Sequence, residues 1–168
     1  MVGSSMVTAM RNILIIGASS GIGAAIADLA QSEEIRVFSL SRTPADHVYR
    51  HFECNVLKDP LPHIEEPLHG LVYCPGSINL KSFSSIKLDD FKQDFELNLL
   101  GAVRCLQSYH ANLLAAKVAS VVMFSTVAVQ TGFPYHALVA ACKGAIEGLT
   151  RASILLILAP NLLYLYDI

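Results

Sequence analysis

One short segment near the amino terminus constrains the fold more than any other part of this sequence. Residues 12–16 (NILII) have the apolar character of a buried strand and lead directly into GASSGIG, Gly17 to Gly23, which opens an apolar-periodic segment. Gly17 suits a tight turn, Gly21 allows the chain to approach a pyrophosphate, and Gly23 allows the next helix to pack closely on the sheet. This order of strand, glycines and helix predicts a dinucleotide-phosphate site at a helix N-terminus. The alternative is a glycine-rich turn that binds no ligand.

Hydrophobic patterning along the rest of the chain predicts strands that alternate with helices. The first helix is expected to face the sheet with Ile22, Ile26, Leu29 and Ala30. Apolar runs of this kind are typical of a parallel sheet covered on both faces, so the predicted fold class is α/β, a doubly wound Rossmann sheet in three αβα layers. The predicted strands are residues 12–16, 35–40, 49–54, 71–74, 118–124 and 162–166, and the predicted helices are 21–31, 88–116, 135–158 and a short, proline-interrupted 59–66.

Composition limits the number of domains and the classes of partner. The 168 residues are 53% hydrophobic with a mean hydropathy of +0.47, which suits one well-packed domain. The chain is too short for two ordinary domains. We place that domain at residues 11–168, after an N-terminal extension of residues 1–10. The net charge is −2 and the twelve Lys and Arg are scattered, which argues against nucleic acid as a partner. The apolar stretches are too short or too interrupted to cross a membrane.

The cysteines and histidines give no sign of a disulfide framework or a metal site. The four cysteines sit singly in apolar surroundings without a CxxC pair, which indicates reduced thiols and a cytoplasmic protein. Asp46, His47, His51 and Cys54 straddle a loop and a strand and lack a matching second cluster. We therefore predict no metal.

The spacing of the first loop is GxxxGxG, and Asn98, Thr126 and Lys143 follow it in order. In these features the chain resembles the short-chain dehydrogenase/reductase family over residues 11–160. The resemblance implies a domain that binds NAD(P) and an oxidoreductase that moves hydride between the nicotinamide and a small carbonyl or alcohol substrate. It also implies a homodimer or homotetramer, for which the long helices carry apolar candidates. These are Leu99, Leu100, Val103, Leu106 and Ile146, although core packing within one subunit explains much of the same pattern.

The end of the second predicted strand bears on which dinucleotide binds. NAD enzymes place an acidic residue there, whereas this chain has Ser41 and Arg42, and a guanidinium suits a 2′-phosphate, so NADP(H) is favoured over NAD(H). The alternative is that Arg42 is a solvated loop residue. Asn55 stands where the family has an Asp near the adenine, and residues 74–76 (CPG) replace the family's NAG turn. The cofactor-binding residues implied are Gly17, Ser19, Ser20, Gly21, Ile22, Gly23, Ser41, Arg42, Asn55, Val56, Pro75, Gly76 and Lys143.

Three of the family's four catalytic positions carry residues that fit their roles. Lys143 matches the Lys that grips the nicotinamide ribose and lowers the pKa of a neighbouring hydroxyl. Asn98 matches the relay Asn, although a purely structural hydrogen bond is an equal alternative. Thr126 falls on the substrate-holding Ser, and Ser125, just before it, offers a second hydroxyl.

Val139 occupies the fourth position, where the family has a Tyr that gives or takes the proton. Valine has no proton to transfer, and general acid–base catalysis needs a titratable group within reach of the reacting oxygen. Three hypotheses follow: His136 or Tyr135 substitutes for the Tyr, an ordered water serves with Lys143 and Thr126, or the protein is a regulatory sensor that binds dinucleotide without turnover. An isomerase or epimerase that acts through bound cofactor is a weaker alternative.

The carboxyl end is a second departure from the family. Family members continue through a further strand, a substrate-covering segment and a closing strand, whereas this sequence stops at Ile168. A parallel sheet without its last strands would expose edge hydrogen bonds and apolar surface. We therefore expect the sequence to be a partial record of a longer protein.

Overall fold

A six-stranded parallel sheet forms the centre of the molecule. The computed structural model describes residues 10–156 and 162–167, and within them the strand order is β3-β2-β1-β4-β5-β6 with every neighbouring pair parallel. The order reverses between β1 and β4, which creates the switch point where such sheets bind ligands. The strands are β1 (Asn12–Ile16), β2 (Arg36–Ser41), β3 (Arg50–Glu53), β4 (Gly70–Tyr73), β5 (Ala119–Phe124) and β6 (Leu162–Asp167).

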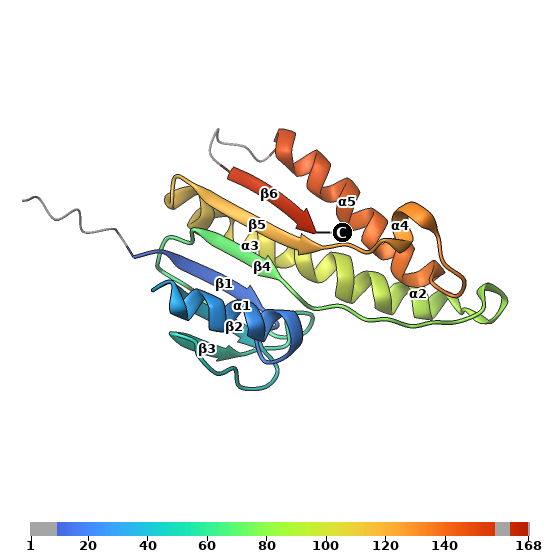
Figure 1. Ribbon diagram of the computed structural model, residues 1–168, viewed down its shortest axis with the longest axis horizontal. Coiled ribbons are helices and arrows are strands. Elements are labelled where there is room, and N and C mark those ends of the chain that lie inside the picture. Colours follow the sequence, from blue (N-terminus) through green and yellow to red (C-terminus); the bar gives the residue numbers. More distant parts are fainter. Residues whose placement is uncertain (1–9, 157–161, 168) are drawn as a thin grey trace, which may run out of the picture.

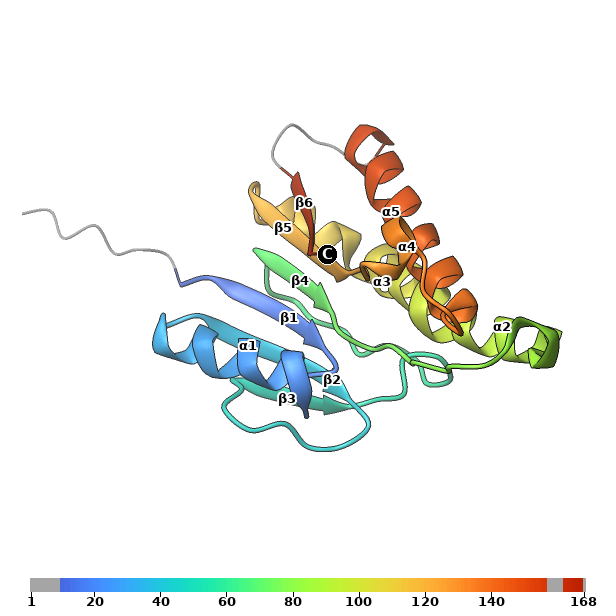
Figure 2. The ribbon, with the colours of Figure 1, turned by 45° about the vertical axis from the view of Figure 1, so that its right-hand side comes forward.

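Helices cover both faces of this sheet, and Figures 1 and 2 show α1 on one face with α3 and α5 on the other. Residues of β1 alternate between two cores: Leu14 and Ile16 pack with α3 and Ile146 of α5, whereas Ile15 packs with Ala27 and Ala30 of α1. The predicted three-layer, doubly wound architecture is therefore confirmed. The helical elements are α1 (Gly21–Ser32), the 3₁₀ turn η1 (Phe83–Ser85), α2 (Leu88–Phe95), the π-helical turn η2 (Glu96–Leu100), α3 (Gly101–Ala115), α4 (Ala128–Thr131) and α5 (Ala137–Leu156).

The predicted buried face of α1 is confirmed in part. Ala30 is buried and Ile26 packs, partly buried, against the core, whereas Ile22 and Leu29 are 58% and 64% exposed. Gly23 and Ala27 are buried in their place. Small side chains allow the helix axis to approach the sheet, and this close approach turns the bulkier residues outward. The hydrophobic spacing was wrong at two positions, because it gave more weight to large apolar residues than to small ones.

The predicted helix over residues 59–66 is wrong, because this segment is irregular and contains no helical turn. Pro60 and Pro62 lack backbone N–H groups and disfavour a helix. Side chains of α3 bind the segment through its carbonyl groups instead. Arg104 donates to Val56 and Asp59, Tyr109 to Pro62, and Asn112 to Ile64 and Glu66.

Some of the apolar residues expected at a subunit contact are core residues. Leu106 and Ile146 are 7% and 1% exposed and pack against the sheet, so their assignment to a surface is wrong. Leu100 is exposed, whereas Leu99 and Val103 are half-buried. Within the described part of the chain, no helix has the length and apolar character needed to span a membrane. The predicted extension falls on residues 1–10 and the predicted end of the last helix on residues 157–158, so both lie outside the described residues except for Met10.

The predicted long helix over residues 88–116 is interrupted by η2. The wider turn displaces the helical hydrogen-bond ladder, and the Leu97 carbonyl accepts a hydrogen bond of 2.6 Å from the Tyr73 hydroxyl. A Cβ at Gly101 would collide with that hydroxyl. The contact joins β4 to the helix that carries Asn98.

We predict opposite effects for alanine at two helical glycines. Gly101→Ala should lower the free energy of unfolding by roughly 1–3 kcal/mol, because its Cβ meets the buried Tyr73 hydroxyl. Gly148→Ala, where a Cβ meets nothing within 4 Å on α5, should raise it by about 0.5–1 kcal/mol. Urea unfolding of both variants tests this, and an unchanged or raised stability of Gly101→Ala would contradict the predicted collision.

Candidate functional site

The loop after β1 is held in a conformation that glycine favours. Gly17 has φ of 82° and Gly21 has φ of 57°, and a Cβ at Gly23 would collide with the Gly17 carbonyl. Helix α1 starts at Gly21, and its N-cap residue Ser20 makes no side-chain capping bond. No acidic side chain lies in the first turn. The positive end of α1 is therefore open to an anion, as the sequence predicted for this loop.

A cavity of about 830 Å³ lies at the carboxyl ends of β1, β2 and β4, next to this loop. Its wall includes nine of the predicted cofactor-binding residues, whereas Gly21, Ile22, Gly23 and Lys143 lie outside it. Polar residues from α2 and η2 close the opposite side. The nine predicted residues are Gly17, Ser19, Ser20, Ser41, Arg42, Asn55, Val56, Pro75 and Gly76.

Arg42 is exposed at the end of β2, and none of the ion pairs between described residues involves it. The preceding Ser41 turns its hydroxyl to the Thr43 carbonyl at 2.9 Å. Across the cavity, the Asn55 side-chain carbonyl accepts from the Leu57 N–H at 3.1 Å, which leaves one lone pair of that oxygen for a ligand. This end of the cavity thus offers a cation, hydroxyls and an acceptor.

Asn98 and Lys143 come together beside Gly76. Asn98 on η2 is 0% exposed, and its Oδ1 has no hydrogen-bond partner. The position that a Gly76 Cβ would occupy lies 3.1 Å from this oxygen and 3.5 Å from the Lys143 Nζ. An unpaired acceptor and an ammonium therefore border one small space, which the missing side chain of Gly76 leaves open at the cavity wall.

The charge of Lys143 is poorly compensated by protein groups. Burial lowers the pKa of its ammonium, and the nearby thiols of Cys142 and Cys74 oppose that shift. No carboxylate among the described side chains pairs with it. Burial also raises the pKa of the Cys74 thiol to about 12, although the Lys143 charge acts in the opposite direction. Cys74 is therefore a protonated thiol at neutral pH.

The two hydroxyls after β5 have different environments. Ser125 donates to the Glu147 carboxylate at 2.6 Å, and Glu147 is buried on α5 with Arg151 3.4 Å from its other oxygen. Thr126 instead accepts a 3.3 Å bond from the Ala128 N–H, which leaves its own proton available. Of the two, Thr126 is the hydroxyl that retains donor capacity.

His136, the predicted stand-in for the missing Tyr, is absent from the cavity lining, as are Asn98, Ser125, Thr126 and Lys143. His136 precedes α5, and because its Nδ1 is 2.7 Å from the Pro134 carbonyl, this nitrogen carries the proton and donates it. Its Nε2 remains available, but His136 does not line the cavity. Val139 is 5% exposed and contributes no titratable group. Among the described side chains, no three His, Cys, Asp or Glu residues gather as a metal site would require.

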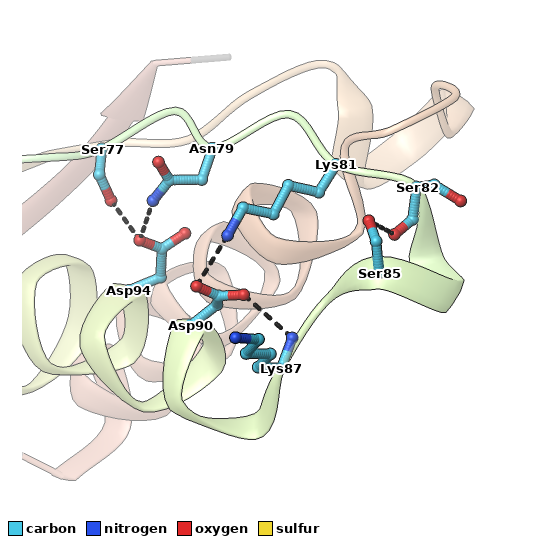
Figure 3. Close-up of polar contacts among 8 residues, drawn as sticks. All are labelled: Ser77, Asn79, Lys81, Ser82, Ser85, Lys87, Asp90 and Asp94. Carbon is cyan, nitrogen blue, oxygen red and sulfur yellow. Dashed lines mark hydrogen bonds and ion pairs between the residues drawn. The ribbon is translucent and has the colours of Figure 1, made fainter.

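Sequence reasoning missed a buried carboxylate in the cavity wall. Asp94 on α2 is 2% exposed and accepts hydrogen bonds from Ser77 and Asn79 (Figure 3). In the sequence, Asp94 stands in a polar run with Asp89, Asp90, Lys92 and Gln93, which is the pattern of a solvated helix face. Its spacing of four residues from Asn98 was the available signal, because it places both on one side of a helix.

Comparison with known proteins places this geometry in a family. A sequence model described as "Enoyl-(Acyl carrier protein) reductase" matches residues 50–153. The chain belongs to the short-chain dehydrogenase/reductase family. The L-xylulose reductases of Bos taurus and Homo sapiens are each 26% identical to it over 154 aligned residues, and each match covers 84% of this chain and 63% of the relative. The chain therefore spans less than two thirds of the length of these relatives.

Solved structures of the family share the fold. The ligand-free aldohexose dehydrogenase of Thermoplasma acidophilum has a TM-score of 0.78 at 24% identity and covers 91% of this chain and 63% of its own. A short-chain dehydrogenase from Streptomyces avermitilis has a TM-score of 0.81 at 22% identity, with coverage of 94% and 64%. ElxO, solved with NADP bound, has a TM-score of 0.76 at 20% identity, with coverage of 88% and 68%.

We predict that Lys143 makes the free energy of unfolding depend on pH in the alkaline range. Because its pKa in the folded protein lies below the ordinary 10.5, the unfolded chain binds more protons as the pH approaches 10.5. The free energy of unfolding of the wild type should therefore rise with pH in the range just below 10.5, relative to Lys143→Met, which has no proton to lose. Urea unfolding across that range measures the difference, with the exposed Lys58→Met as control. Parallel pH profiles of the wild type and Lys143→Met would contradict the prediction.

Proposed function

We propose that this short-chain dehydrogenase/reductase is an NAD(P)-dependent oxidoreductase that acts on a small carbonyl or alcohol substrate, with NADP(H) preferred. The observation that carries the proposal is the continuity of one cavity from the open end of α1 to Gly76, where Lys143 and Asn98 meet. When bound, the nicotinamide would supply or accept the hydride. The names of the L-xylulose reductases and of the NADP-bound ElxO structure support this choice.

The residues present fit such a cofactor. The N-terminus of α1 would hold the diphosphate, since its amides point out of the helix and no side chain caps them. Arg42 would hold a 2′-phosphate at the end of β2. Lys143 would bind hydroxyls of the nicotinamide ribose across the space beside Gly76, where any larger side chain would intrude. An unpaired ammonium and an unpaired buried oxygen are the complement that a ribose or a bridging water requires.

The proton step is the part in which this chain departs from its family. Thr126 would hold the substrate oxygen, because the Ser125 proton already goes to Glu147. In the absence of a Tyr at position 139, Lys143 would act with Thr126 and an ordered water, and burial, which lowers the pKa of the Lys143 ammonium, favours release of a proton. His136 would contribute only if its Nε2 reached the substrate from the start of α5.

Two further expectations remain proposals. The thiols at Cys54, Cys74, Cys105 and Cys142 are all free, which suits a reducing cytoplasm. Exposed Leu100 on η2 would serve a homodimer or homotetramer contact.

The cofactor preference is tested at Arg42. Arg42→Ala should weaken NADPH binding roughly 10- to 100-fold, because losing charge-assisted hydrogen bonds to a phosphate costs affinity of that order. NADH has no 2′-phosphate, so its binding should be unchanged. Calorimetric titration with both coenzymes measures this, and Lys58→Ala removes an exposed charge from a neighbouring loop as a control. Equal losses for NADPH and NADH, or none for either, would remove the argument for NADP(H).

Turnover is tested by NADPH oxidation over a panel of small aldehydes and ketones. The proposal predicts measurable oxidation by the wild type, a loss of about 100-fold in Thr126→Val, and a gain in Val139→Tyr. A loss in His136→Ala as large as that in Thr126→Val would identify His136 as the proton donor in place of Lys143. If the wild type binds NADPH but oxidises none while Val139→Tyr does, the protein is a dinucleotide sensor, and the enzyme assignment fails.

A further inference from the structure

We propose that Asp94 and Ser77 are positioning residues, which fix the side-chain amide of Asn98 so that its oxygen faces Lys143. This role lies outside the positions carried over from the family, and its functional part rests on the proposed dinucleotide site. The argument depends on which atoms in this cluster can donate and which can only accept.

Both protons of the Asn98 amide are committed. Its Nδ2 lies 2.9 Å from the Asp94 backbone carbonyl and 3.1 Å from the Ser77 Oγ. The carbonyl can only accept, so one amide proton must point to it. The second proton goes to Ser77 only if the Ser77 hydroxyl presents a lone pair in that direction.

Asp94 ensures that it does. The Ser77 Oγ lies 2.7 Å from the Asp94 Oδ1, which accepts in this contact, whereas the Asp94 Oδ2 has no hydrogen-bond partner. The Ser77 hydroxyl must therefore donate to Asp94, which leaves its lone pairs for Asn98. Asn79 donates to the same carboxylate oxygen at 2.8 Å, so two donors hold Asp94 in place (Figure 3).

The consequence reaches Lys143. With the nitrogen of the Asn98 amide bound to Asp94 and Ser77, the oxygen is directed to the opposite side, where it lies beside Gly76. A flipped amide would place N–H protons next to the Lys143 ammonium and would turn the amide oxygen toward the Asp94 carbonyl and the lone pairs of Ser77. The Asp94–Ser77 pair therefore sets the polarity of the space that the nicotinamide ribose or a water would enter.

A second carboxylate, that of Asp90, also binds the segment of residues 77–87 but makes no contact with the Asn98 amide. Asp90 on α2 pairs with Lys81 at 2.8 Å and accepts from the Lys87 N–H at 2.9 Å (Figure 3). Its side chain is 21% exposed, whereas Asp94 is almost fully buried. Asp90→Asn thus perturbs the attachment of residues 77–87 and leaves the Asn98 amide intact, which makes it the matched control.

The first test is spectroscopic and needs no cofactor. In ¹⁵N-labelled protein, the two side-chain amide protons of Asn98, assigned by their loss in Asn98→Asp, should exchange slowly with solvent. Ser77→Ala should accelerate that exchange by about tenfold or more, because one proton loses its acceptor. Asp94→Leu should do the same, because the Ser77 hydroxyl loses its own acceptor and becomes free to turn its proton toward the amide. Asp94→Asn and Ser77→Thr keep an acceptor and a hydroxyl, respectively, and should preserve slow exchange, as should Asp90→Asn. A merely structural role for Asp94 would not give this pattern of rescue.

The second test is NADPH binding to the same variants. Ser77→Ala and Asp94→Leu should weaken it by about tenfold, whereas Asp94→Asn and Asp90→Asn should remain within about twofold of the wild type. Slow Asn98 exchange retained in Ser77→Ala would overturn the proposal, as would equal losses in Asp94→Asn and Asp94→Leu. If Asp94→Leu fails to fold, the test rests on Ser77→Ala, because Ser77 is only half-buried and its hydroxyl can be removed with little effect on packing. A wild type that binds no NADPH but shows the expected exchange pattern supports the orientation of Asn98 and refutes the proposed cofactor.

Discussion

The hydrogen bond from Tyr73 to the Leu97 carbonyl is the constraint on which the arrangement of this site depends. Tyr73 ends β4 at the centre of the sheet, and Leu97 lies in the π-helical turn η2. Gly101 allows the helix to lie directly against the Tyr73 hydroxyl. Asn98 is the next residue after Leu97, so the same contact that docks the helix on the sheet sets the depth at which Asn98 meets Gly76 and Lys143. A regular helix at this place would rotate Asn98 to a different angle.

The sequence was sufficient for the topology and for one end of the cavity, and physical reasons explain where it failed. Strand periodicity and the glycine loop are local signals, which is why residues 12–16 form a strand and Gly17 lies in the turn that follows. The cavity-wall residues beyond that loop, such as Arg42 and Asn55, came from the resemblance to the family. Burial of α1 depends instead on how closely the helix approaches the sheet, which the hydropathy of Ile22 and Leu29 does not encode. The turn at η2 and the role of Asp94 depend on contacts with Tyr73, Ser77 and Asn79, which are 15 to 24 residues away in sequence.

The environment of Ser125 and Thr126 shows how neighbouring hydroxyls acquire separate roles. Ser125 satisfies the buried Glu147 carboxylate, which would otherwise be an expensive lone charge against the sheet. Arg151 on the outer side of α5 supplies the second partner of that carboxylate. This commitment leaves Thr126 with a free proton at the end of β5. The sequence could not separate the two hydroxyls, because the distinction comes from a residue on α5 rather than from either position.

Lys143 illustrates the cost of a prepared binding site. Burial disfavours its charge, no described carboxylate offsets it, and the neighbouring acceptor oxygen of Asn98 is itself unpaired. The Asp94–Ser77 bonds hold the amide, and its oxygen and the Lys143 ammonium both border the space that the missing side chain of Gly76 leaves. Unsatisfied buried groups lower the stability of the ligand-free protein. Because an incoming polar molecule could supply partners to both groups at once, this pair favours a site built for a ligand over one built for stability.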